Sequence, residues 1–474
     1  MSNSTNASAR ERINALLDDM SFVEVGSLVT SRGTDFNLQN KENPADGVVT
    51  GYGVIDGNLV YVYSQDASVL GGAIGEMHAK KIANIYDMAM KMGAPVIGLI
   101  DCAGLRLQEA TDALYGFGNI FLKQSMASGV IPQITGIFGS CGGGTALIPA
   151  LSDFTFMTKE AKLFVNSPNA LEGNYEGKED TASAAYQSEN TGNVDGVFDT
   201  EAELLGQIRQ LVNILPACND DDASYGECTD DLNRVVAGIE GHKDDARAVL
   251  TTISDDNFFL ETKKDTAKSI VTGFIRLNGV TVGCVGNQAA EGKGELCACC
   301  VTKAAEFVNF CDAFNIPVLT LTNVTGFKAT ACNEKKIAKA AAKLVYTYAN
   351  ATVPKVNVLI GQAFGTPALV MNAKAIGADI VYAWPEAKFS TMDAEPAVKI
   401  MYADEIGAAK DKVNFIKEKA AMFEETQSSA MAAAKRGYID DIIEPDATRK
   451  RVIAAFEMLF TKREDRPAKK HGAV

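Results

Sequence analysis

The sequence contains only three histidines, His78, His242 and His471, among its 474 residues. A Ser-His-Asp triad and most general acid–base sites need a histidine as the base, so chemistry of that kind has little raw material. Glu160 and Glu386 remain as alternative bases, although their shared E-A-K setting fits a solvated turn equally well. The shortage of such groups favours a mechanism that depends on oriented backbone dipoles.

Positive charge is also in short supply. Lys and Arg number 45 against 60 Asp and Glu, which gives a formal net charge of −15. Nucleic-acid binding requires clustered Lys and Arg, so we expect no nucleic-acid partner. The chain has no apolar run of the about 18 residues that span a bilayer, and its N-terminus has no apolar signal core. We therefore expect a cytoplasmic protein.

The ten cysteines do not form a recognisable metal or disulfide framework. They are scattered, and a chain of this size needs no disulfide scaffold, so a reducing compartment fits them best. Cys297, Cys299 and Cys300 cluster, but they lack a second ligand pair at a spacing typical of zinc. We interpret them as structural cysteines and predict no metal site.

Nucleotide-binding and biotin-attachment motifs are absent or out of place. The segment GSCGGGT has no following lysine, and no G-x-G-x-x-G opens a helix after the first predicted strand. The tetrapeptide AMKM matches a usual biotin-attachment sequence, but its Lys91 closes an amphipathic helical pattern instead of lying at an exposed hairpin turn. We therefore do not expect biotin to be attached to this chain.

What the sequence does contain is an internal duplication with a constant offset of 222 positions. Gly51 and Gly57 of VTGYGVIDGN align with Gly273 and Gly279 of VTGFIRLNGV. The same offset aligns GAPVIGL with NIPVLTL, AGLR with TGFK, and GSCGGG with GQAFGT. A constant offset over about 100 residues indicates two copies of one structural unit.

The duplication predicts two domains, residues 1–225 and 232–474, joined by the acidic segment 217–231. In each copy a β-hairpin pattern is followed by an amphipathic helix, and then by short apolar runs that read as buried strands. Residues 173–192 look like a mobile surface loop. Alternating strands and helices predict an α/β fold with a mostly parallel sheet flanked by helices.

The most suggestive motif is a glycine-rich turn between a strand and a helix. Gly142, Gly143 and Gly144 end an apolar run, and TALIPAL follows as the start of a helix. Helix N-termini present unpaired N–H groups, and glycines allow a ligand to approach them closely. The segment AFGTPALVM places a related turn in the second copy. Two such turns suit a reaction with two developing oxyanions, although each also fits a plain tight turn.

The sequence resembles the biotin-dependent acyl-CoA carboxyltransferases. These are the β subunits of propionyl-CoA and acetyl-CoA carboxylases and the carboxyltransferase subunits of sodium-pumping acyl-CoA decarboxylases. The segments that carry the resemblance are VVTGYGVIDGNLVYVYSQDASVLGGAIGEMHAKKI, GAPVIGLIDCAGLRLQEA, SGVIPQITGIFGSCGGGTALIPALSDFTFM and RGYIDDIIEPDATRKRVIAAF. The resemblance runs nearly end to end and implies tandem crotonase-like (ClpP/crotonase spiral) domains.

The resemblance also implies where each substrate binds. In the family the N-terminal half binds the acyl-CoA, the C-terminal half binds biotin, and the active site forms between halves of two subunits. Carried over by position, Gly143 and Gly144 would hold the thioester oxygen, with Gly104 and Gly142 beside the acyl-CoA. The biotin ureido oxygen would lie near Phe364, Gly365 and Thr366. The acyl α-proton would pass to the ureido group, so no side-chain base is required.

The resemblance implies a set of partners as well. Biotin would come on a separate biotin carboxyl carrier protein, and a biotin carboxylase or a membrane decarboxylase subunit would complete the complex. The substrate would be a short acyl-CoA, either propionyl/methylmalonyl-CoA or acetyl/malonyl-CoA, and the chain would form a homo-oligomer, from dimer to hexamer. Neither the acyl chain nor the direction, carboxylation or decarboxylation, follows from the sequence.

The C-terminal half departs from the family pattern at several positions. The usual A-Y-G-G-A is AFGTP, so Pro367 brings a residue without an N–H. The usual D-V-P-G-F is NVTGF, with Asn323 and Thr325. The usual helix start G-I-I-R-H-G-A-K is KIAKAAAK, residues 336–343. Separately, Leu369 stands at a position that helps sort acyl chain length in the family, where propionyl-type members tend to have Asp. Two alternatives stay open: a crotonase-type acyl-CoA hydrolase or isomerase that uses only the N-terminal half, and a non-catalytic assembly subunit with a degraded biotin site, to which Pro367 would point.

Overall fold

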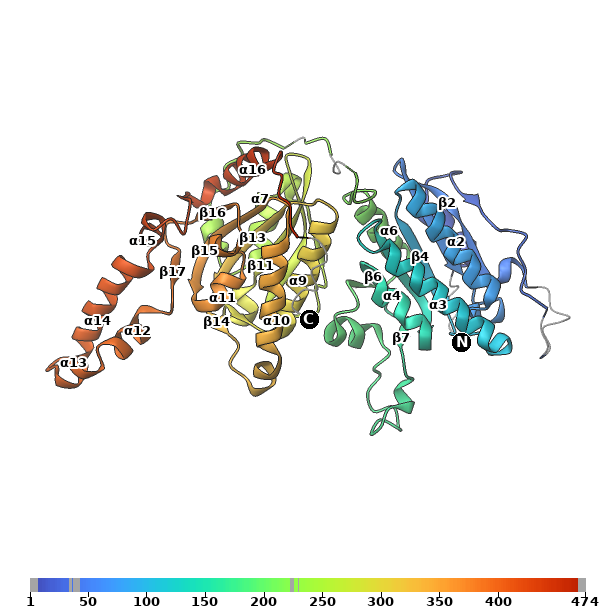
Figure 1. Cartoon of the computed structure of the whole chain (residues 1–474), viewed down its shortest axis with the longest axis horizontal. Helices are drawn as coiled ribbons and strands as arrows, with labels where there is room; N and C mark the ends of the chain where they lie inside the picture. Colours follow the sequence, from blue (N-terminus) through green and yellow to red (C-terminus); the bar gives the residue numbers. More distant parts are fainter. Residues whose placement is uncertain (1–6, 34–35, 37–42, 222–225, 229, 468–474) are drawn as a thin grey trace. The chain divides into compact units, whose positions relative to one another are not determined.

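The computed structural model describes residues 7–33, 36, 43–221, 226–228 and 230–467, and the chain divides into two compact units. Unit 1 comprises Met1–Ser224 and unit 2 comprises Tyr225–Val474. Each unit is built around one eight-stranded, mostly parallel sheet with helices packed on it, as the strand–helix alternation predicted (Figure 1).

The sheet of unit 1 has the strand order β1-β2-β3-β4-β5-β6-β8, and β7 pairs with the far end of β5. Its strands are β1 (Val23–Glu24), β2 (Val48–Ile55), β3 (Asn58–Gln65), β4 (Val96–Cys102), β5 (Gln133–Gly142), β6 (Phe154–Thr158), β7 (Lys162–Phe164) and β8 (Gly196–Phe198). The predicted hairpin is β2–β3, and Asp56 and Gly57 turn it with positive φ angles of 48° and 85°. From β3 onward all pairings are parallel.

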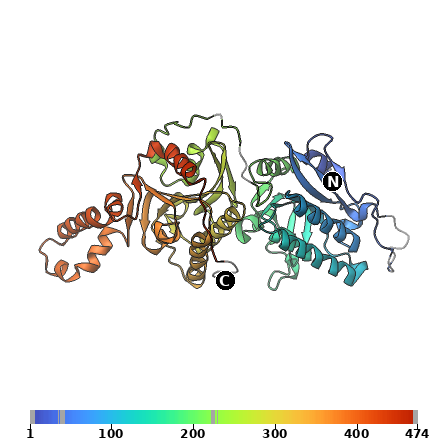
Figure 2. The ribbon, with the colours of Figure 1, turned by 45° about the horizontal axis from the view of Figure 1, so that its top comes forward.

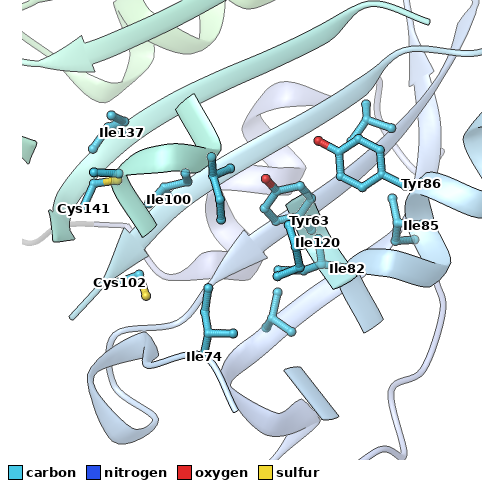
Figure 3. Close-up of a cluster of buried hydrophobic side chains, with 14 of the residues drawn as sticks. Tyr63, Ile74, Ile82, Ile85, Tyr86, Ile100, Cys102, Ile120, Ile137 and Cys141 are labelled. Atoms are coloured by element: carbon cyan, nitrogen blue, oxygen red, sulfur yellow. The ribbon is translucent and has the colours of Figure 1, made fainter. Parts of the chain in front are cut away.

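The helices of unit 1 are α1 (Ala9–Leu16), α2 (Glu76–Met92), α3 (Ala110–Ala127), α4 (Leu147–Leu151), α5 (Ala184–Tyr186) and α6 (Glu201–Val212). Helices α2 and α3 pack side by side. Helix α2 buries Ile82, Ile85 and Ala89 at helical spacing and ends at Gly93, whose φ is 61°. These side chains join Tyr63, Ile100 and Ile137 from the strands in one apolar core (Figure 3).

Unit 2 repeats this topology in the order β9-β10-β11-β13-β15-β16-β18, and β17 pairs with the far end of β15. Its strands are β9 (Phe259–Thr262), β10 (Ile270–Leu277), β11 (Val280–Asn287), β13 (Val318–Val324), β15 (Lys355–Phe364), β16 (Ile380–Ala383), β17 (Lys388–Ser390) and β18 (Asp441–Ile442). A small second sheet pairs β12 (Glu295–Leu296) with β14 (Gly326–Phe327). The bounds of β10, β11, β13 and β15 lie 222 positions after those of β2, β3, β4 and β5, which is the offset seen in the sequence.

The helices of unit 2 are α7 (Ala246–Ile253), α8 (Ala289–Gly292), α9 (Ala298–Ala313), α10 (Ala331–Asn350), α11 (Gly365–Val370), α12 (Ala394–Met401), α13 (Ala403–Ala408), α14 (Lys412–Phe423), α15 (Ala430–Lys435) and α16 (Thr448–Leu459). Helices α12, α13 and α14 have no counterpart in unit 1 and stand away from the sheet of unit 2 (Figures 1 and 2). They fill the connection between the bridge residues Lys388 and Ser429, which Lys162 and Ser183 match in unit 1.

Two expectations require correction. Residues 173–192 are not a loop throughout, because α5 and a π-helical turn at Gln187–Thr191 occupy their second half. The cysteine cluster contains a disulfide, Cys297–Cys300, which the sequence did not predict. Among the described residues, no helix combines the length and the apolar character that crossing a bilayer demands.

Candidate active site

The glycine turn of unit 1 lies where β5 ends. Gly143 has a φ of 61°, which an L side chain rarely adopts, and the turn leads into a short 3₁₀ helix (Gly143–Ala146) and α4. A Cβ built on Gly143 would meet no heavy atom within 4 Å, so the turn faces open space and is not packed shut. Since the first N–H groups of a helix have no partner within it, Gly143 and Gly144 can offer theirs to a ligand.

The loop after β4 lies directly against this turn. Gly104 has a φ of 113°, and a Cβ there would come within 3.3 Å of the carbonyl oxygen of Gly142. The Cys102 sulfur accepts the N–H of Gly104 at 3.3 Å and lies 3.4 Å from the Thr145 hydroxyl. Burial raises the pKa of the Cys102 thiol, so it stays a neutral hydrogen-bonding group at physiological pH. The structure thus brings together all four glycines that the family resemblance implied in this half.

A buried ion cluster around Arg106 holds the loop that contains Gly104. The Arg106 guanidinium contacts Asp46 at 2.5 Å and Glu109 at 2.8 Å, and all three side chains are almost fully buried. Ile74 also donates its N–H to the Gly104 carbonyl at 2.9 Å. Because Asp46 lies 60 residues before Arg106, the sequence held no local signal for this cluster.

The glycine turn of unit 2 repeats that of unit 1 position by position. Phe364 caps α11, and Gly365 has a φ of 64°, close to that of Gly143, which lies 222 positions earlier. Gly365 is half-buried and Thr366 is exposed, and the same holds for Gly143 and Gly144 respectively. A cavity of about 380 Å³ opens on this turn. It is lined by Thr325, Gly326, Phe327, Gln362, Phe364, Gly365, Pro367, Thr391, Met392 and Asp393.

Pro367 breaks no hydrogen bond within α11. It is the third residue of the helix, so its missing N–H takes one free donor from the first turn, but Gly365 and Thr366 before it keep their N–H groups. Thr325 also has a defined place, because its hydroxyl donates to the Lys293 carbonyl at 2.9 Å and the residue lines the cavity. Both substitutions are therefore compatible with an open turn.

A second cavity, of about 820 Å³, begins at the same turn and runs toward α14. Lys419 and Arg436 contribute positive charge to its lining, and Met401, Tyr402 and Phe423 contribute apolar surface. The sequence did not point to this cavity, because it depends on helices that belong to the unit 2 insertion. The sequence does not indicate that these helices line a cavity together with Gly365.

Among the described lining residues of the Gly365 cavity the one carboxylate is Asp393, which caps the start of α12. His78 is fully buried, and burial lowers its pKa to about 3, so the ring is neutral. His242, Glu160 and Glu386 are exposed, and His471 lies outside the described residues. Among the residues that the structure describes, no group of three or more His, Cys, Asp or Glu side chains gathers as a metal site would.

Comparison with known proteins agrees with this geometry. The chain matches the carboxyl transferase domain family over residues 3–474. It is 41% identical to the propionyl-CoA carboxylase beta chain of Roseobacter denitrificans, covering 98% of this chain and 93% of that protein. It is 40% identical to the methylmalonyl-CoA decarboxylase subunit alpha of Propionigenium modestum, covering 98% and 92%.

A solved structure supports the same assignment. Transcarboxylase 12S, described as a hexamer assembly with hydrolysed methylmalonyl-coenzyme A bound, superposes with a TM-score of 0.94 at 40% identity, covering 98% of this chain and 92% of that one. The predicted tandem crotonase-like fold and the family resemblance are both confirmed. The family match and these relatives agree with the two matched glycine turns and the duplicated sheets. The chain therefore belongs to the carboxyl transferase family of enzymes.

Proposed function

We propose that this chain moves a carboxyl group between biotin and a short-chain acyl-CoA, with the acyl-CoA on unit 1 and biotin on unit 2. The observation that carries the proposal is the pair of open turns at Gly143 and Gly365, which have nearly the same φ, the same exposure and the same place after equivalent strands. A reaction with two oxygens that gain negative charge needs two such sites.

The acyl-CoA turn would act on the thioester oxygen. The N–H groups of Gly143 and Gly144 point away from a helix start, where the dipole favours negative charge. They would stabilise the oxygen as the neighbouring carbon loses its proton. Cys102 and Arg106 would hold the turn and its supporting loop in place, so that the donors need not reorganise during the reaction.

The residues of unit 2 fit a biotin ring. The cavity of about 380 Å³ has an apolar wall at Phe327 and Phe364 and a backbone donor at Gly365, and the adjacent Thr366 lines the second cavity at the same turn. Biotin supplies the transferable carboxyl group when bound. The Gly365 and Thr366 N–H groups would hold the ureido oxygen, and no side chain of this chain would need to act as a base.

Biotin would arrive on a separate carrier protein. Lys91, the lysine of the attachment-like tetrapeptide, lies in the last turn of α2 and not at a hairpin. The relatives include carboxylase and decarboxylase subunits, so we further propose a biotin carboxylase or a membrane decarboxylase subunit as the other partner.

A homo-oligomer would cover two apolar faces. Leu114, Tyr115, Leu122 and Met126 are exposed on α3, and Ile400, Met401, Val413 and Met422 are exposed on α12 to α14. Apolar faces of this kind are typical of interfaces between subunits. The similar transcarboxylase 12S is described as a hexamer, which supports an oligomer of this chain.

The acyl chain would be short, as in propionyl/methylmalonyl-CoA or acetyl/malonyl-CoA. Leu369 is 37% exposed and lines two cavities beside the turn of unit 2. Leu369 does not select between the two acyl chains. Comparing exchange from malonyl-CoA and from methylmalonyl-CoA would decide between the two.

The test is carboxyl exchange between methylmalonyl- or malonyl-CoA and free biotin. A Gly144→Pro variant removes one donor, whereas Gly144→Ala keeps it, and a Cβ at Gly144 would make only an ordinary 3.5 Å contact with Phe117. We expect the proline variant to lose about 100- to 1,000-fold in kcat and the alanine variant to lose much less. Thr366→Pro and Thr366→Ala form the matched pair in unit 2.

Other outcomes would identify the alternatives. Thioester hydrolysis without biotin, sensitive to Gly144→Pro and indifferent to Thr366→Pro, would indicate a crotonase-type hydrolase. Binding of acyl-CoA with no turnover of any kind would indicate an assembly subunit. Equal losses in the proline and alanine variants would contradict the assigned role of the backbone donors.

A further inference from the structure

Cys297 and Cys300 form a disulfide at the start of α9. Cys297 is the N-cap of this helix, and its sulfur accepts the N–H of Cys300. The two residues differ in exposure, because Cys297 is partly exposed whereas Cys300 is fully buried. A C-x-x-C pair at a helix start, with a more exposed first cysteine and a buried second one, is an arrangement that suits thiol–disulfide exchange.

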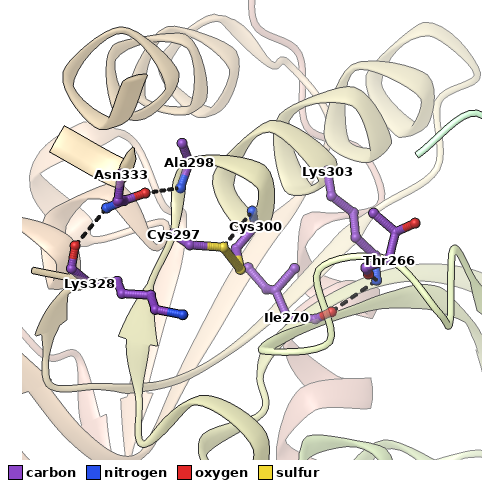
Figure 4. The surroundings of a disulfide bond; sticks show 8 residues. All are labelled: Thr266, Ile270, Cys297, Ala298, Cys300, Lys303, Lys328 and Asn333. Atoms are coloured by element: carbon purple, nitrogen blue, oxygen red, sulfur yellow. Dashed lines mark hydrogen bonds between the residues drawn. A yellow bond between two sulfur atoms is a disulfide. The ribbon is translucent and has the colours of Figure 1, made fainter. Parts of the chain in front are cut away.

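The disulfide turn is hydrogen-bonded to Asn333, which also bonds to Lys328 beside the wall of the cavity on Gly365; Figure 4 shows the bonds of Asn333. Asn333 is nearly buried, and its side chain accepts the N–H of Ala298 at 2.7 Å and donates to the Lys328 carbonyl at 2.8 Å. Lys328 in turn donates its N–H to the carbonyl of Leu296 at 2.9 Å. Lys328 directly follows β14, whose Gly326 and Phe327 line the cavity, so these three hydrogen bonds connect the disulfide turn to that wall.

Unit 1 fixes the equivalent place without a disulfide. There the start of α2 is held by the Glu109 carboxylate, which accepts the Glu76 N–H at 2.6 Å, and Arg106 links Glu109 to Asp46. In unit 2 the positions 222 residues later carry Lys328, Ala331 and Lys268, which cannot rebuild this cluster. In unit 2 the disulfide and Asn333 therefore hold the start of α9 in place, as the ion cluster holds the start of α2 in unit 1.

We propose that Cys297–Cys300 is a reversible thiol-exchange site whose redox state sets the geometry of the cavity wall in unit 2. A thiolate of a small dithiol attacks the accessible Cys297 sulfur, the Cys297–Cys300 bond breaks, and Cys300 leaves as a thiolate that takes up a proton. The second thiol of the reductant then displaces Cys297 as a thiol. The protein gains two electrons and two protons, and the dithiol becomes a disulfide.

The consequence for activity rests on the proposed function of the Gly365 turn. Reduction frees the first turn of α9, and with it the Ala298 N–H that anchors Asn333 and the β14 wall. It leaves the Gly143 turn, which belongs to unit 1, without any change. We therefore expect the KM for biotin to rise several-fold on reduction while the KM for acyl-CoA stays constant.

The exchange site is tested on the full chain by alkylation with N-ethylmaleimide and mass spectrometry. Before reduction, peptides carrying Cys297 and Cys300 should be unlabelled. After treatment with dithiothreitol both should be labelled, and removal of the reductant in air should restore the bond. Cys299→Ser and Cys332→Ser, which remove neighbouring exposed thiols, should leave this cycle intact, and Cys300→Ser should abolish it. Labelling of both cysteines without reductant, and no return of the bond under an oxidised dithiol, would overturn the proposal.

The coupling to the cavity wall is tested by a readout that needs no activity. Hydrogen exchange of the backbone should increase on reduction in peptides that cover β12, β14 and the start of α10, and not in peptides from unit 1. The same comparison in Cys300→Ser should show the increase without reductant. Unchanged exchange in β14 would refute the coupling whatever the enzyme does, whereas increased exchange with no biotin dependence of activity would refute only the function assigned to this turn.

Discussion

The Asn323 side-chain oxygen accepts the backbone N–H of Gln362 at 3.0 Å. Asp101, 222 positions before Asn323, accepts the N–H of Ser140 in the same way at 3.4 Å. Each contact secures the strand just before its glycine turn, so the change from carboxylate to amide preserves the support of the turn. The departure of Asn323 from the family pattern therefore does not signal a decayed site.

An amide is needed at position 323 because Asn323 also contacts the carboxylate of Asp244. The Asn323 nitrogen donates to the Asp244 carboxylate at 2.9 Å, so Asn323→Asp would place two carboxylates in contact. We expect this variant to lose about 1–3 kcal/mol of unfolding free energy in urea denaturation. The double variant Asn323→Asp/Asp244→Asn should recover most of the loss, and a double variant as unstable as the single one would show that the cause lies elsewhere.

The buried cluster beneath the Gly104 loop should depend strongly on Arg106. Arg106→Ala leaves Asp46 and Glu109 buried without a counter-charge, which should cost about 3–5 kcal/mol. Arg451→Ala serves as the control, because its ion pair with Asp441 is solvent-exposed and should contribute about 0–1 kcal/mol. Chemical denaturation of both variants measures the difference, and equal losses would contradict the role of burial.

Protonation of His78 should make stability fall in acid. Its Nδ1–H donates to the Asp46 carbonyl, and its Nε2 accepts from Gln65, so the folded ring is neutral with a pKa of about 3. The unfolded ring takes up a proton near its ordinary pKa of 6.5, so the contribution to stability is complete above about pH 6.5 and is lost as the pH falls toward about 3.

The measurement is the unfolding free energy as a function of pH in wild type and His78→Gln. The advantage of the wild type should shrink by up to about 1.4 kcal/mol per pH unit below pH 6.5. His242→Gln, which changes an exposed histidine, is the matched control. An advantage that does not change with pH would mean that folding leaves the pKa of His78 near its ordinary value.

The glycines near the turn of unit 1 should tolerate alanine very differently. At Gly143 a Cβ meets nothing within 4 Å, so Gly143→Ala should cost only the strain of its φ of 61°, about 1–2 kcal/mol. At Gly72 a Cβ would overlap with the carbonyl oxygen of Asp101, and φ is also positive, so Gly72→Ala should cost about 2–5 kcal/mol. Thermal and urea unfolding of the two variants provide the comparison, and the reverse order of cost would refute it.

The sequence by itself determined the repeated topology and the places of the two turns. Strands and their connections follow from local patterns of apolar residues and glycine. The same patterns recur at a constant offset in the second copy, so the sequence alone shows that Gly143 and Gly365 occupy equivalent positions.

Only the tertiary structure decided what surrounds those turns. Cys102 reaches Thr145, and Arg106 reaches Asp46, because strand pairing brings together residues that lie 43 and 60 positions apart. The cavity beside α14 likewise depends on where the insertion of unit 2 comes to lie. The local residue pattern determines the backbone conformation. Contacts between side chains far apart in the sequence form only when the sheet brings the ends of the intervening chain together.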